Sequence, residues 1–399
     1  MRVALIHYWL VAERGGEKVL RALCDMFPQA VIFTHVADRV LTDRLFPGHE
    51  IRESFIAKLP FARRAYKSYL PLMPLALEEL DLRGFDLVIA FESGPAKGAI
   101  TDPGAVHVCY CFTPMRYIWD HYRLYRDNAG FLARMTLPFF AHWLRQWDFA
   151  SAARVDAFIA DSAFVGQRIK KYYRRESTVV HPPVDIEAFA ATPRGADPRF
   201  AGAYLWVGQL TAYKRPDIAV SALAGIKRRL IVIGDGEETE ALKAMADNDY
   251  IEFLGRAPDE VVRRAFASAR ALIFPGEEDF GMTPVEAMAS GLPVIALGRG
   301  GALSTVVDGE TGILFDDQSR EGLQAAVRRF ESMEATFDSD VLRRHAQQFS
   351  THAFKQAMTE ALRIAGVAIR NDVSPARGET NEAIFPQSQL REISAFPKR

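Results

Sequence analysis

An acidic loop ahead of a helix start is the part of this sequence with the clearest chemistry. Residues 274–293 read FPGEEDFGMTPVEAMASGLP. The apolar run that ends there predicts a strand. Thr283 as N-cap, with Pro284 next and Glu286 three residues past the cap, predicts a helix opened by a capping box. The capping box accounts for Glu286 but gives no role to Glu278.

The predicted helix start is suited to an anion. Its first amides have no partner inside the helix, and Gly281 lets a ligand approach the backbone closely. We therefore expect the amides of Gly281, Met282 and Thr283 to bind a phosphate, with Phe280 beside them. The carboxylates of the loop, Glu278 above all, would bind sugar hydroxyls.

Short apolar runs at the spacing of βαβ units must position these residues. Helix-length segments separate most of the runs, which predicts mostly parallel sheets with covering helices. The runs are Val3–His7, Ala30–Thr34, Leu87–Phe91, Val106–Cys111 and Ala157–Ala160, then Ala203–Val207, Leu230–Ile233, Ile251–Leu254, Ala271–Phe274 and Pro293–Ala296. The sequence therefore predicts an α/β protein with two Rossmann-like, doubly wound domains that face a cleft.

The predicted boundary between the two domains lies near the middle of the chain. The helical pattern of residues 166–173 ends before His181, and residues 191–202 are rich in Ala, Pro and Gly. We assign residues 1–185 to a first domain and 186–370 to a second domain, whose last helix could return to the first. Residues 371–399 have the composition of a poorly ordered or surface-draped tail.

The composition excludes several classes of protein. The 399 residues include 49 Lys or Arg and 50 Asp or Glu, a balance that does not favour a nucleic-acid binder. The chain is 49% hydrophobic and 25% charged, as in ordinary globular enzymes. No uncharged apolar stretch approaches the ~18 residues of a membrane span, and the first residues do not read as a signal peptide. We expect a cytoplasmic protein whose three cysteines are buried.

The acidic stretch resembles the signature of the family 4 retaining glycosyltransferases of the GT-B fold, in which seven residues separate two glutamates. Glu278 and Glu286 fit that spacing in EDFGMTPVE, with ARALIFP before it and AMASGLPVIA after it. In the family, the first Glu contacts the donor hexose and the second contacts the ribose of the nucleotide. The resemblance implies these roles for Glu278 and Glu286. It also implies that the first domain binds the acceptor and the second the nucleotide sugar.

A second match follows the first predicted strand of the second domain, in VGQLTAYKRP. Family members hold the donor diphosphate here with an Arg and a Lys. Lys214 matches the Lys, Gln209 stands where Arg is usual, and Arg215 is a possible substitute. A surface lysine at a helix start is the alternative for Lys214. Gly234 belongs to a GDG turn that resembles the family's turn near the nucleotide.

In the first domain, Gly15 and Gly16 match the family loop that approaches the donor phosphates and the acceptor. A plain tight turn is the alternative. YCFTPMRYIWD, residues 110–120, resembles a cleft motif of bacterial mannosyltransferases that build O-antigen and exopolysaccharide. Most relatives have His where this chain has Phe112, which implies either that another group supplies that contact or that turnover is reduced.

Three further residues of this region are candidate contacts in the cleft. Arg116 and Asp120 are expected to contact the donor or the acceptor. His107 lies five residues before Phe112 and is a weaker candidate for the acceptor.

The resemblance implies transfer of a hexose from a nucleotide diphosphate sugar, with GDP-mannose favoured, to a hydroxyl of a lipid-linked saccharide in cell-surface polysaccharide assembly. The resemblance also implies that the anomeric configuration is retained and that Glu278, Lys214 and Arg116 are the catalytic residues. No cofactor or metal is implied, because positive side chains and a helix dipole would stabilise the leaving diphosphate.

Three other hypotheses remain. A UDP-sugar could be the donor. A glycosyltransferase-like subunit that binds a nucleotide sugar without turnover is favoured by Gln209 and Phe112. A dinucleotide oxidoreductase is disfavoured, because no GxGxxG follows the first strand.

Two aromatic segments could face a membrane. Split at Pro182, the halves carry 24 basic against 19 acidic and 25 against 31 residues, or +5 and −6. Residues 55–70 interleave aromatic side chains with Lys58, Arg63, Arg64 and Lys67. This pattern fits peripheral attachment to an anionic bilayer or a lipid-linked substrate, and equally a solvated helix packed on its own domain. For residues 131–147, the pattern favours a buried helix.

Overall fold

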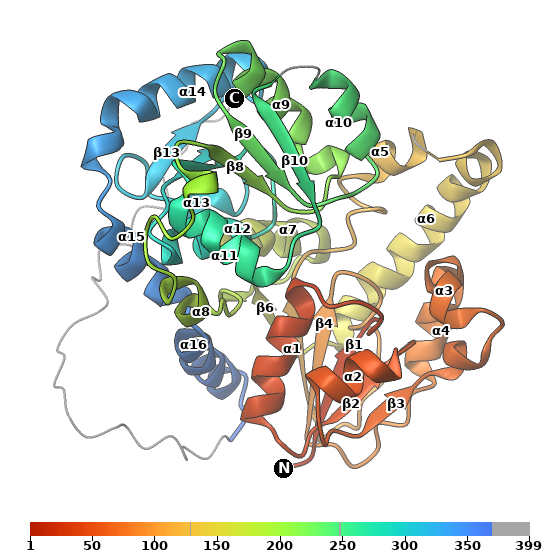
Figure 1. Cartoon of the computed structure of the whole chain (residues 1–399). Coiled ribbons are helices and arrows are strands. Elements are labelled where there is room, and N and C mark those ends of the chain that lie inside the picture. The colour runs from red at the N-terminus through yellow and green to blue at the C-terminus, as the bar shows by residue number, and fades with distance from the viewer. Residues whose placement is uncertain (128, 247–248, 369–399) are drawn as a thin grey trace, which may run out of the picture. The chain divides into compact units, whose positions relative to one another are not determined.

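The computed structural model describes residues 1–127, 129–246 and 249–368. Residues 1–367 form one compact unit, which holds two sheets (Figure 1). In the described part of the chain, seven parallel strands form the first sheet in the order β3-β2-β1-β4-β5-β6-β7. Its strands are β1 (Val3–His7), β2 (Val31–Thr34), β3 (Ile51–Glu53), β4 (Leu87–Glu92), β5 (Val106–Cys111), β6 (Ala157–Ala160) and β7 (Thr178–Val179).

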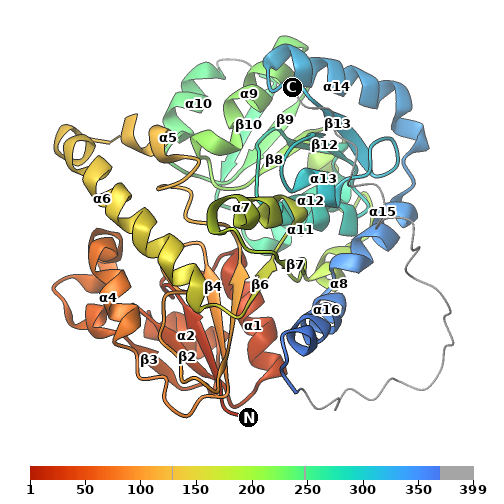
Figure 2. The ribbon, with the colours of Figure 1, turned by 180° about the vertical axis from the view of Figure 1, so that it is seen from behind.

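Helices cover both faces of this sheet. Figure 1 shows α1 and α2 in front of the strands, and the reverse view in Figure 2 shows α6 in front of them. The helices are α1 (Gly15–Met26), α2 (Arg39–Leu45), α3 (Ala62–Ala65), α4 (Met73–Glu78), α5 (Tyr122–Asp127), α6 (Phe131–Ser151) and α7 (Ala163–Tyr173), with 3₁₀ turns η1 (Phe55–Lys58), η2 (Tyr66–Leu72) and η3 (Ala152–Arg154). Residues 55–72 are therefore a series of short turns and not one amphipathic helix.

The second sheet has six parallel strands among the described residues, in the order β10-β9-β8-β11-β12-β13. Its strands are β8 (Tyr204–Val207), β9 (Leu230–Ile233), β10 (Ile251–Gly255), β11 (Ala271–Phe274), β12 (Val294–Leu297) and β13 (Gly312–Phe315). Its helices are α8 (Ile186–Ala190), α9 (Pro216–Gly225), α10 (Thr239–Met245), α11 (Asp259–Ser268), α12 (Met282–Ala289), α13 (Ala302–Thr305), α14 (Arg320–Met333) and α15 (Ser339–Ala346), with 3₁₀ turns η4 (Pro198–Phe200), η5 (Ala212–Lys214), η6 (Glu334–Thr336) and η7 (Gln347–Phe349).

The chain crosses between the two sheets twice. It leaves the first sheet after β7, and residues 182–202, around the predicted domain boundary, hold α8, which contacts α11 and α12. It returns beside the first crossing, where Val184 pairs with Ser350. The last described helix, α16 (Thr351–Ile364), contacts α1, and Lys355 forms an ion pair with Asp25 at 3.0 Å.

The central strands are apolar because they are covered on both faces, as parallel strands usually are. Strands β1, β4, β9, β11 and β12 are buried along their whole length. The prediction of two Rossmann-like domains is confirmed.

The sequence analysis did not predict three of the described strands, and a local feature of each strand explains why. Strand β3 carries Arg52 and Glu53, and β7 has only two residues. Strand β13 has an apolar run of only three residues, which follows Gly312, where a Cβ would lie 2.0 Å from the Val294 carbonyl oxygen.

The prediction that residues 131–147 form a buried helix is wrong for the first half of that helix. In α6, the buried residues are Ala141, Leu144, Asp148 and Ser151, whereas residues 131–136 are all exposed. Within the described residues, no helix is long and apolar enough to cross a membrane. The predicted tail, residues 371–399, lies outside the described residues.

Candidate functional site

The helix start predicted to bind an anion forms two residues earlier than expected. Helix α12 begins at Met282 and its N-cap is Gly281, at φ 85°. The prediction of Thr283 as N-cap in a capping box with Glu286 is wrong, because Gly281 adopts the left-handed conformation that ends the loop and Thr283 already lies inside the helix. No side chain of the described residues caps α12, so the amides of Met282 and Thr283 stay available to a ligand.

The Phe280 side chain does not face a ligand. Its ring is buried and packs on His181 and Phe349, with ring centroids 5.3 and 5.6 Å away. Only the backbone of Phe280 is therefore left for the predicted donor contact. The buried ring anchors the acidic loop to the hydrophobic core of the second domain.

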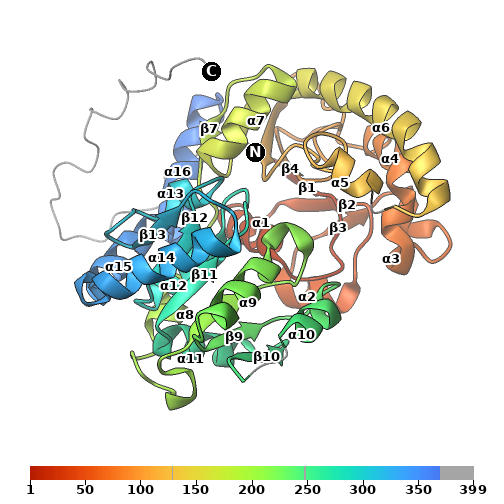
Figure 3. The same cartoon turned by 90° about the horizontal axis from the view of Figure 1, so that it is seen from above.

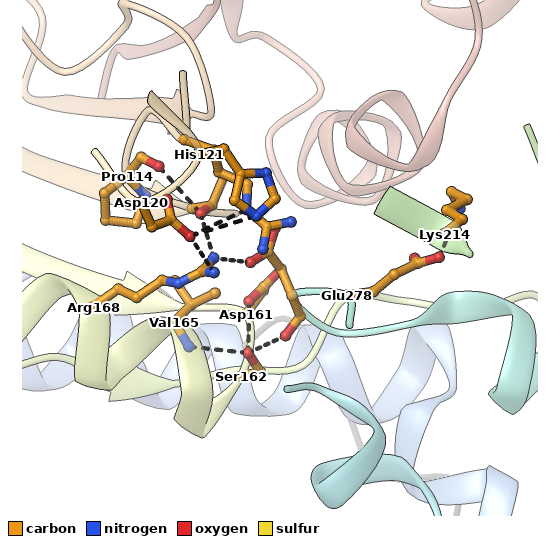
Figure 4. Close-up of polar contacts among 12 residues, drawn as sticks. Pro114, Asp120, His121, Asp161, Ser162, Val165, Arg168, Lys214 and Glu278 are labelled. Atoms are coloured by element: carbon orange, nitrogen blue, oxygen red, sulfur yellow. Dashed lines mark hydrogen bonds and ion pairs between the residues drawn. The ribbon is translucent and has the colours of Figure 1, made fainter. Parts of the chain in front are cut away.

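Lys214 and Glu278 meet beside this helix start. Their Nζ and Oε1 atoms lie 2.7 Å apart, and both side chains are mostly buried, with exposed fractions of 17% and 18% (Figure 4). Burial acts to lower the pKa of Lys214, but Glu278, Tyr213 and Glu286 together outweigh burial and the pKa is raised. The ammonium group therefore stays charged, as a contact to a diphosphate requires.

Two glycines let the backbone come close to Lys214. A Cβ on Gly276 would lie 2.8 Å from the Lys214 Cα atom, and a Cβ on Gly208 would lie 3.6 Å from its Nζ atom. Gly234 in turn approaches Gly208 so closely that its Cβ would lie 1.8 Å from the Gly208 carbonyl oxygen. The GDG turn predicted to lie near the nucleotide is thus next to the loop that carries Lys214.

The other two residues proposed for the diphosphate are arranged differently. The Arg215 guanidinium is held by Asp217, with Nη2 and Oδ2 2.8 Å apart. Gln209 is exposed, and its backbone carbonyl accepts a hydrogen bond from the Thr211 amide. Lys214 is therefore the cation of this loop that directly faces the acidic stretch.

The glycine start of α1 faces the start of α12. A Cβ on Gly15 would lie 3.0 Å from the Met282 sulfur atom. One turn further along α1, Lys18 Nζ donates to Glu286 Oε1 at 3.0 Å. Lys18, which the sequence analysis did not single out, thus holds the carboxylate that the family resemblance assigns to the ribose.

Beneath Gly16 lie His7 and Phe112. A Cβ on Gly16 would lie 3.1 Å from His7 Nε2 and 3.4 Å from the Phe112 ring. Phe112 stacks on Phe91 and contacts Tyr110 edge-on. The close approach of these rings, and not a turn with positive φ, is what requires glycine at position 16.

His7 is a second residue that the sequence analysis did not identify. It is fully buried, its Nδ1 donates to the Trp9 carbonyl oxygen at 3.0 Å, and burial lowers its pKa to about 4. Its Nε2 atom is buried without a partner among the described residues. Because Nδ1 carries the proton, Nε2 presents a bare lone pair beside Gly16 and Phe112. The sequence feature that could have indicated this role is the position of His7 at the end of a predicted strand, shortly before Gly15 and Gly16.

His107 does not belong to this site. It is the second residue of β5, where its Nδ1 donates to the Arg154 carbonyl oxygen and its amide donates to Asp156. Phe112 follows the opposite end of the same strand, about 16 Å away at ~3.3 Å per residue. The prediction of His107 as an acceptor contact is therefore wrong, because the strand runs away from the site between the two residues.

An ionic cluster joins the acidic loop to the first domain (Figure 4). Arg168 on α7 pairs with Asp279, donates through Nη1 to Thr113 Oγ1 at 3.0 Å, and donates through Nη2 to Asp120 Oδ2 at 2.6 Å. Ser162, the N-cap of α7, donates to the Asp279 carbonyl oxygen at 2.5 Å. Asp279 is the residue after Glu278, so these bonds fix the position of Glu278.

Arg116 and Asp120, both predicted as cleft contacts, belong to this cluster. Arg116 Nη1 lies 3.5 Å from Asp279 Oδ2, and its Nε lies 3.6 Å from Asp120 Oδ2. The Arg116 Nη2 atom is buried and has no hydrogen-bond partner in the described residues. Burial raises the pKa of Asp279, although Arg116 and Arg168 oppose the change. Within the described ranges, no group of acidic, His and Cys side chains could hold a metal ion.

Two family models match the chain, one over each sheet. The model "Glycosyltransferase Family 4" matches residues 14–188, and the model "Glycosyl transferases group 1" matches residues 202–354. The two matches include all the site residues above except His7.

Curated proteins similar to the chain include D-inositol 3-phosphate glycosyltransferases. That of Geodermatophilus obscurus is 28% identical over 50% of this chain and 50% of its own length, and that of Mycobacterium sp. (strain KMS) is 33% identical over 35% of each. The chain spans about half the length, or less, of these relatives.

Solved structures share the fold over nearly the whole chain. Sucrose-phosphate synthase from Thermosynechococcus elongatus has a TM-score of 0.68 at 19% identity, covering 91% of this chain and 98% of its own. The apo form of the lipopolysaccharide outer core galactosyltransferase WaaB has a TM-score of 0.65 at 18% identity, covering 91% and 99%. Anabaena Alr3699/HepE in complex with UDP-glucose has a TM-score of 0.64 at 16% identity, covering 91% and 100%.

Proposed function

Because the chain combines the two domains of the GT-B glycosyltransferases, we propose that it is a retaining hexosyltransferase that uses a nucleotide diphosphate sugar. The observation that carries the proposal is the Lys214–Glu278 pair at the uncapped start of α12. This pair places one cation, one carboxylate and free amides together, where the start of α1 faces the start of α12. A diphosphate and a sugar need those three kinds of group.

In the proposed complex, Lys214 and the amides of Met282 and Thr283 bind the diphosphate. Glu278 binds the donor hexose, and Glu286 binds the ribose after exchanging its bond with Lys18. Arg116 keeps a free Nη2 atom for a phosphate or an acceptor, and Arg168 holds the acidic loop in place. His7 offers an acceptor atom where relatives have His at the position of Phe112.

The chemical step needs no nucleophile from the protein. The bond from the anomeric carbon to the diphosphate oxygen breaks, and the acceptor hydroxyl oxygen bonds to that carbon on the same face. The hydroxyl proton passes to the departing diphosphate. Lys214 and the α12 amides stabilise the negative charge that develops on the diphosphate, and the surrounding groups position the acceptor.

For the donor, GDP-mannose is our first candidate, on the resemblance of residues 110–120 to mannosyltransferases. A UDP-sugar is the alternative, and the Anabaena neighbour was solved with UDP-glucose. For the acceptor, we propose a lipid-linked saccharide of cell-surface polysaccharide assembly, bound by a cytoplasmic enzyme that associates peripherally with the membrane. Lys58, Arg63, Arg64 and Lys67 are exposed, as this association requires.

A subunit that binds a nucleotide sugar without turnover is a second candidate. Phe112 favours it, because an aromatic ring packed on Phe91 and Tyr110 cannot replace a histidine hydrogen bond. The exposed Gln209 favours it as well, because it supplies no second charge to the diphosphate.

Two experiments separate these functions. The first is a thermal-shift screen against GDP, UDP and their sugars. The nucleotide that the protein binds should raise its melting temperature. Transfer of radiolabel from the matching sugar into an organic-extractable lipid fraction should then reveal the enzyme. A ligand-dependent shift with no transfer to lipid or hydrolysis would support the non-catalytic subunit, and no shift with any nucleotide would refute the proposed site.

A further inference from the structure

The first half of α6 carries a row of uncovered apolar side chains. The exposed fractions are 82% for Phe131, 75% for Leu132, 59% for Met135 and 80% for Phe139. At 100° per residue, Phe131, Met135, Phe139 and Trp143 follow one another along one stripe of the helix, which spans about 18 Å. The buried residues Ala141 and Leu144 lie in the second half of α6, which packs on the domain.

Two neighbouring segments extend this row into a larger surface. Leu124 and Tyr125 on α5 are exposed, as are Leu72 and Leu75 around α4. Leu70 packs both against the residues beneath α3 and α4 and against the cluster beneath α6, and Figures 1 and 3 both show α3 and α4 beside α6. We call Leu72, Leu75, Leu124, Tyr125, Phe131, Leu132, Met135, Phe139 and Trp143 the α6 surface.

The charges around the α6 surface have one dominant sign. Residues 131–147 contain no Asp or Glu but contain Arg134 and Arg145. Arg64, Lys67, Arg123 and Arg134 are exposed, against the exposed acidic residues Glu79 and Asp127 of the same segments. Exposed aromatic and aliphatic side chains flanked by arginine and lysine are the composition of helices that lie in the interface of an anionic bilayer.

We propose that the α6 surface enters the headgroup region of an anionic bilayer and is the main membrane contact of this protein. The inference deepens the proposed peripheral association: residues 55–70 supply basic charge, but most of their aromatic side chains pack inward, so α6 supplies the apolar contact.

The same helix connects the bilayer to the site. Asp148 of α6 accepts a hydrogen bond from Trp119 Nε1 at 2.7 Å, and Leu144 packs in one cluster with Met115 and Ile118. These partners flank Arg116 and Asp120, which belong to the ionic cluster that holds Glu278. Docking of α6 therefore places the lipid surface on the side of the first domain that carries the proposed acceptor residues.

The test is sedimentation with vesicles of phosphatidylcholine containing 30% phosphatidylglycerol, and with vesicles of phosphatidylcholine alone. The test variant is Phe131→Ser with Leu132→Ser and Phe139→Ser. The matched control is Val40→Ser with Ile364→Ser, which removes two side chains that are exposed elsewhere. We expect the wild type and the control to bind the anionic vesicles, and the test variant to bind at least tenfold more weakly.

Two measurements keep the result interpretable. The melting temperature of the test variant and its shift with nucleotide should equal those of the wild type, because the three side chains are exposed and make none of the site contacts described above. Sugar transfer to a short water-soluble acceptor should also be unchanged, so a failure of the membrane proposal differs from a failure of the proposed function. If the test variant does not fold, quenching of wild-type Trp143 by brominated lipid, with Trp143→Phe as reference, decides the question.

Three outcomes would overturn the proposal. Equal vesicle binding by the wild type and the test variant would place the contact elsewhere. No vesicle binding by the wild type would remove the membrane partner. A wild-type dimer in light scattering that becomes a monomer in the test variant would show that α6 binds a second copy of the chain.

Discussion

Lys214→Met tests whether the 2.7 Å pair between Lys214 and Glu278 is the diphosphate site. Methionine keeps most of the side-chain stem that passes Gly208 and removes only the ammonium group. A charge-assisted hydrogen bond is worth about 1.5–3 kcal/mol, so the dissociation constant for GDP or UDP should rise about 10- to 150-fold. Titration calorimetry with the matching free nucleoside should show almost no change, because the ammonium contacts only phosphate.

The structure makes the partner of Lys214 part of the same test. In Lys214→Met, the mostly buried Glu278 carboxylate loses its cation and faces the diphosphate with an uncompensated charge. Adding Glu278→Gln removes that charge and should recover at least about twofold of the lost affinity. Lys243→Met is the matched control, because Lys243 pairs with Glu240 on the exposed side of α10.

Two results would refute this reasoning. An equal loss of affinity for nucleoside and nucleotide would mean that Lys214 supports the fold of the loop and does not contact phosphate. Exact additivity of the two substitutions would mean that Glu278 does not share a site with the bound diphosphate.

Three further predictions follow from the site. Glu278→Gln should abolish most sugar transfer in the radiolabel assay while nucleotide binding stays within a few-fold of wild type; transfer at the wild-type rate would misplace the hexose. Glu286→Ala should weaken nucleotide binding in calorimetry but leave the melting temperature near that of the wild type, because Gly281 and not a capping box starts α12; a large drop in melting temperature with normal affinity would give Glu286 a structural role only. His7 alone should lower the free energy of unfolding by about 3 kcal/mol between pH 6.5 and 4, because its pKa is about 4 in the folded protein and 6.5 in the unfolded chain, which therefore binds the extra proton. Urea titrations at several pH values should show a flatter pH profile of this free energy for His7→Gln. An unchanged profile would contradict the burial of a neutral His7.

The central strands could be predicted from the sequence because each is a short, continuous apolar run buried on both faces. The acidic stretch could be found because Glu278 and Glu286 keep a fixed spacing along one segment. Both signals are local, so one sequence carries them. The pairing of Lys214 with Glu278 could be anticipated only through the resemblance, since 64 positions separate the two residues.

The groups that the sequence did not reveal act through contacts between distant segments. Arg168 belongs to an ordinary amphipathic helix until the fold brings Asp120 and Asp279 to its guanidinium group. In the sequence, Lys18 cannot be distinguished from an ordinary exposed lysine of α1. Its partner Glu286 reaches it because α12 lies beside α1 in the fold. The prediction placed the N-cap of α12 at the wrong residue for a different reason. Thr283 is a residue type that often caps helices, but α12 already begins after Gly281, which adopts the left-handed conformation.

The return of α16 to α1 has a consequence for synthesis on the ribosome. The first domain is discontinuous in sequence, since its layer beside α1 is completed by residues 351–364. Domains usually fold in the order in which they emerge, but here α1 has no α16 to pack against until the whole second domain has been translated. Nascent chains arrested before residue 351 should therefore expose the α1 flank to chaperones and proteases, even when the second sheet has already formed.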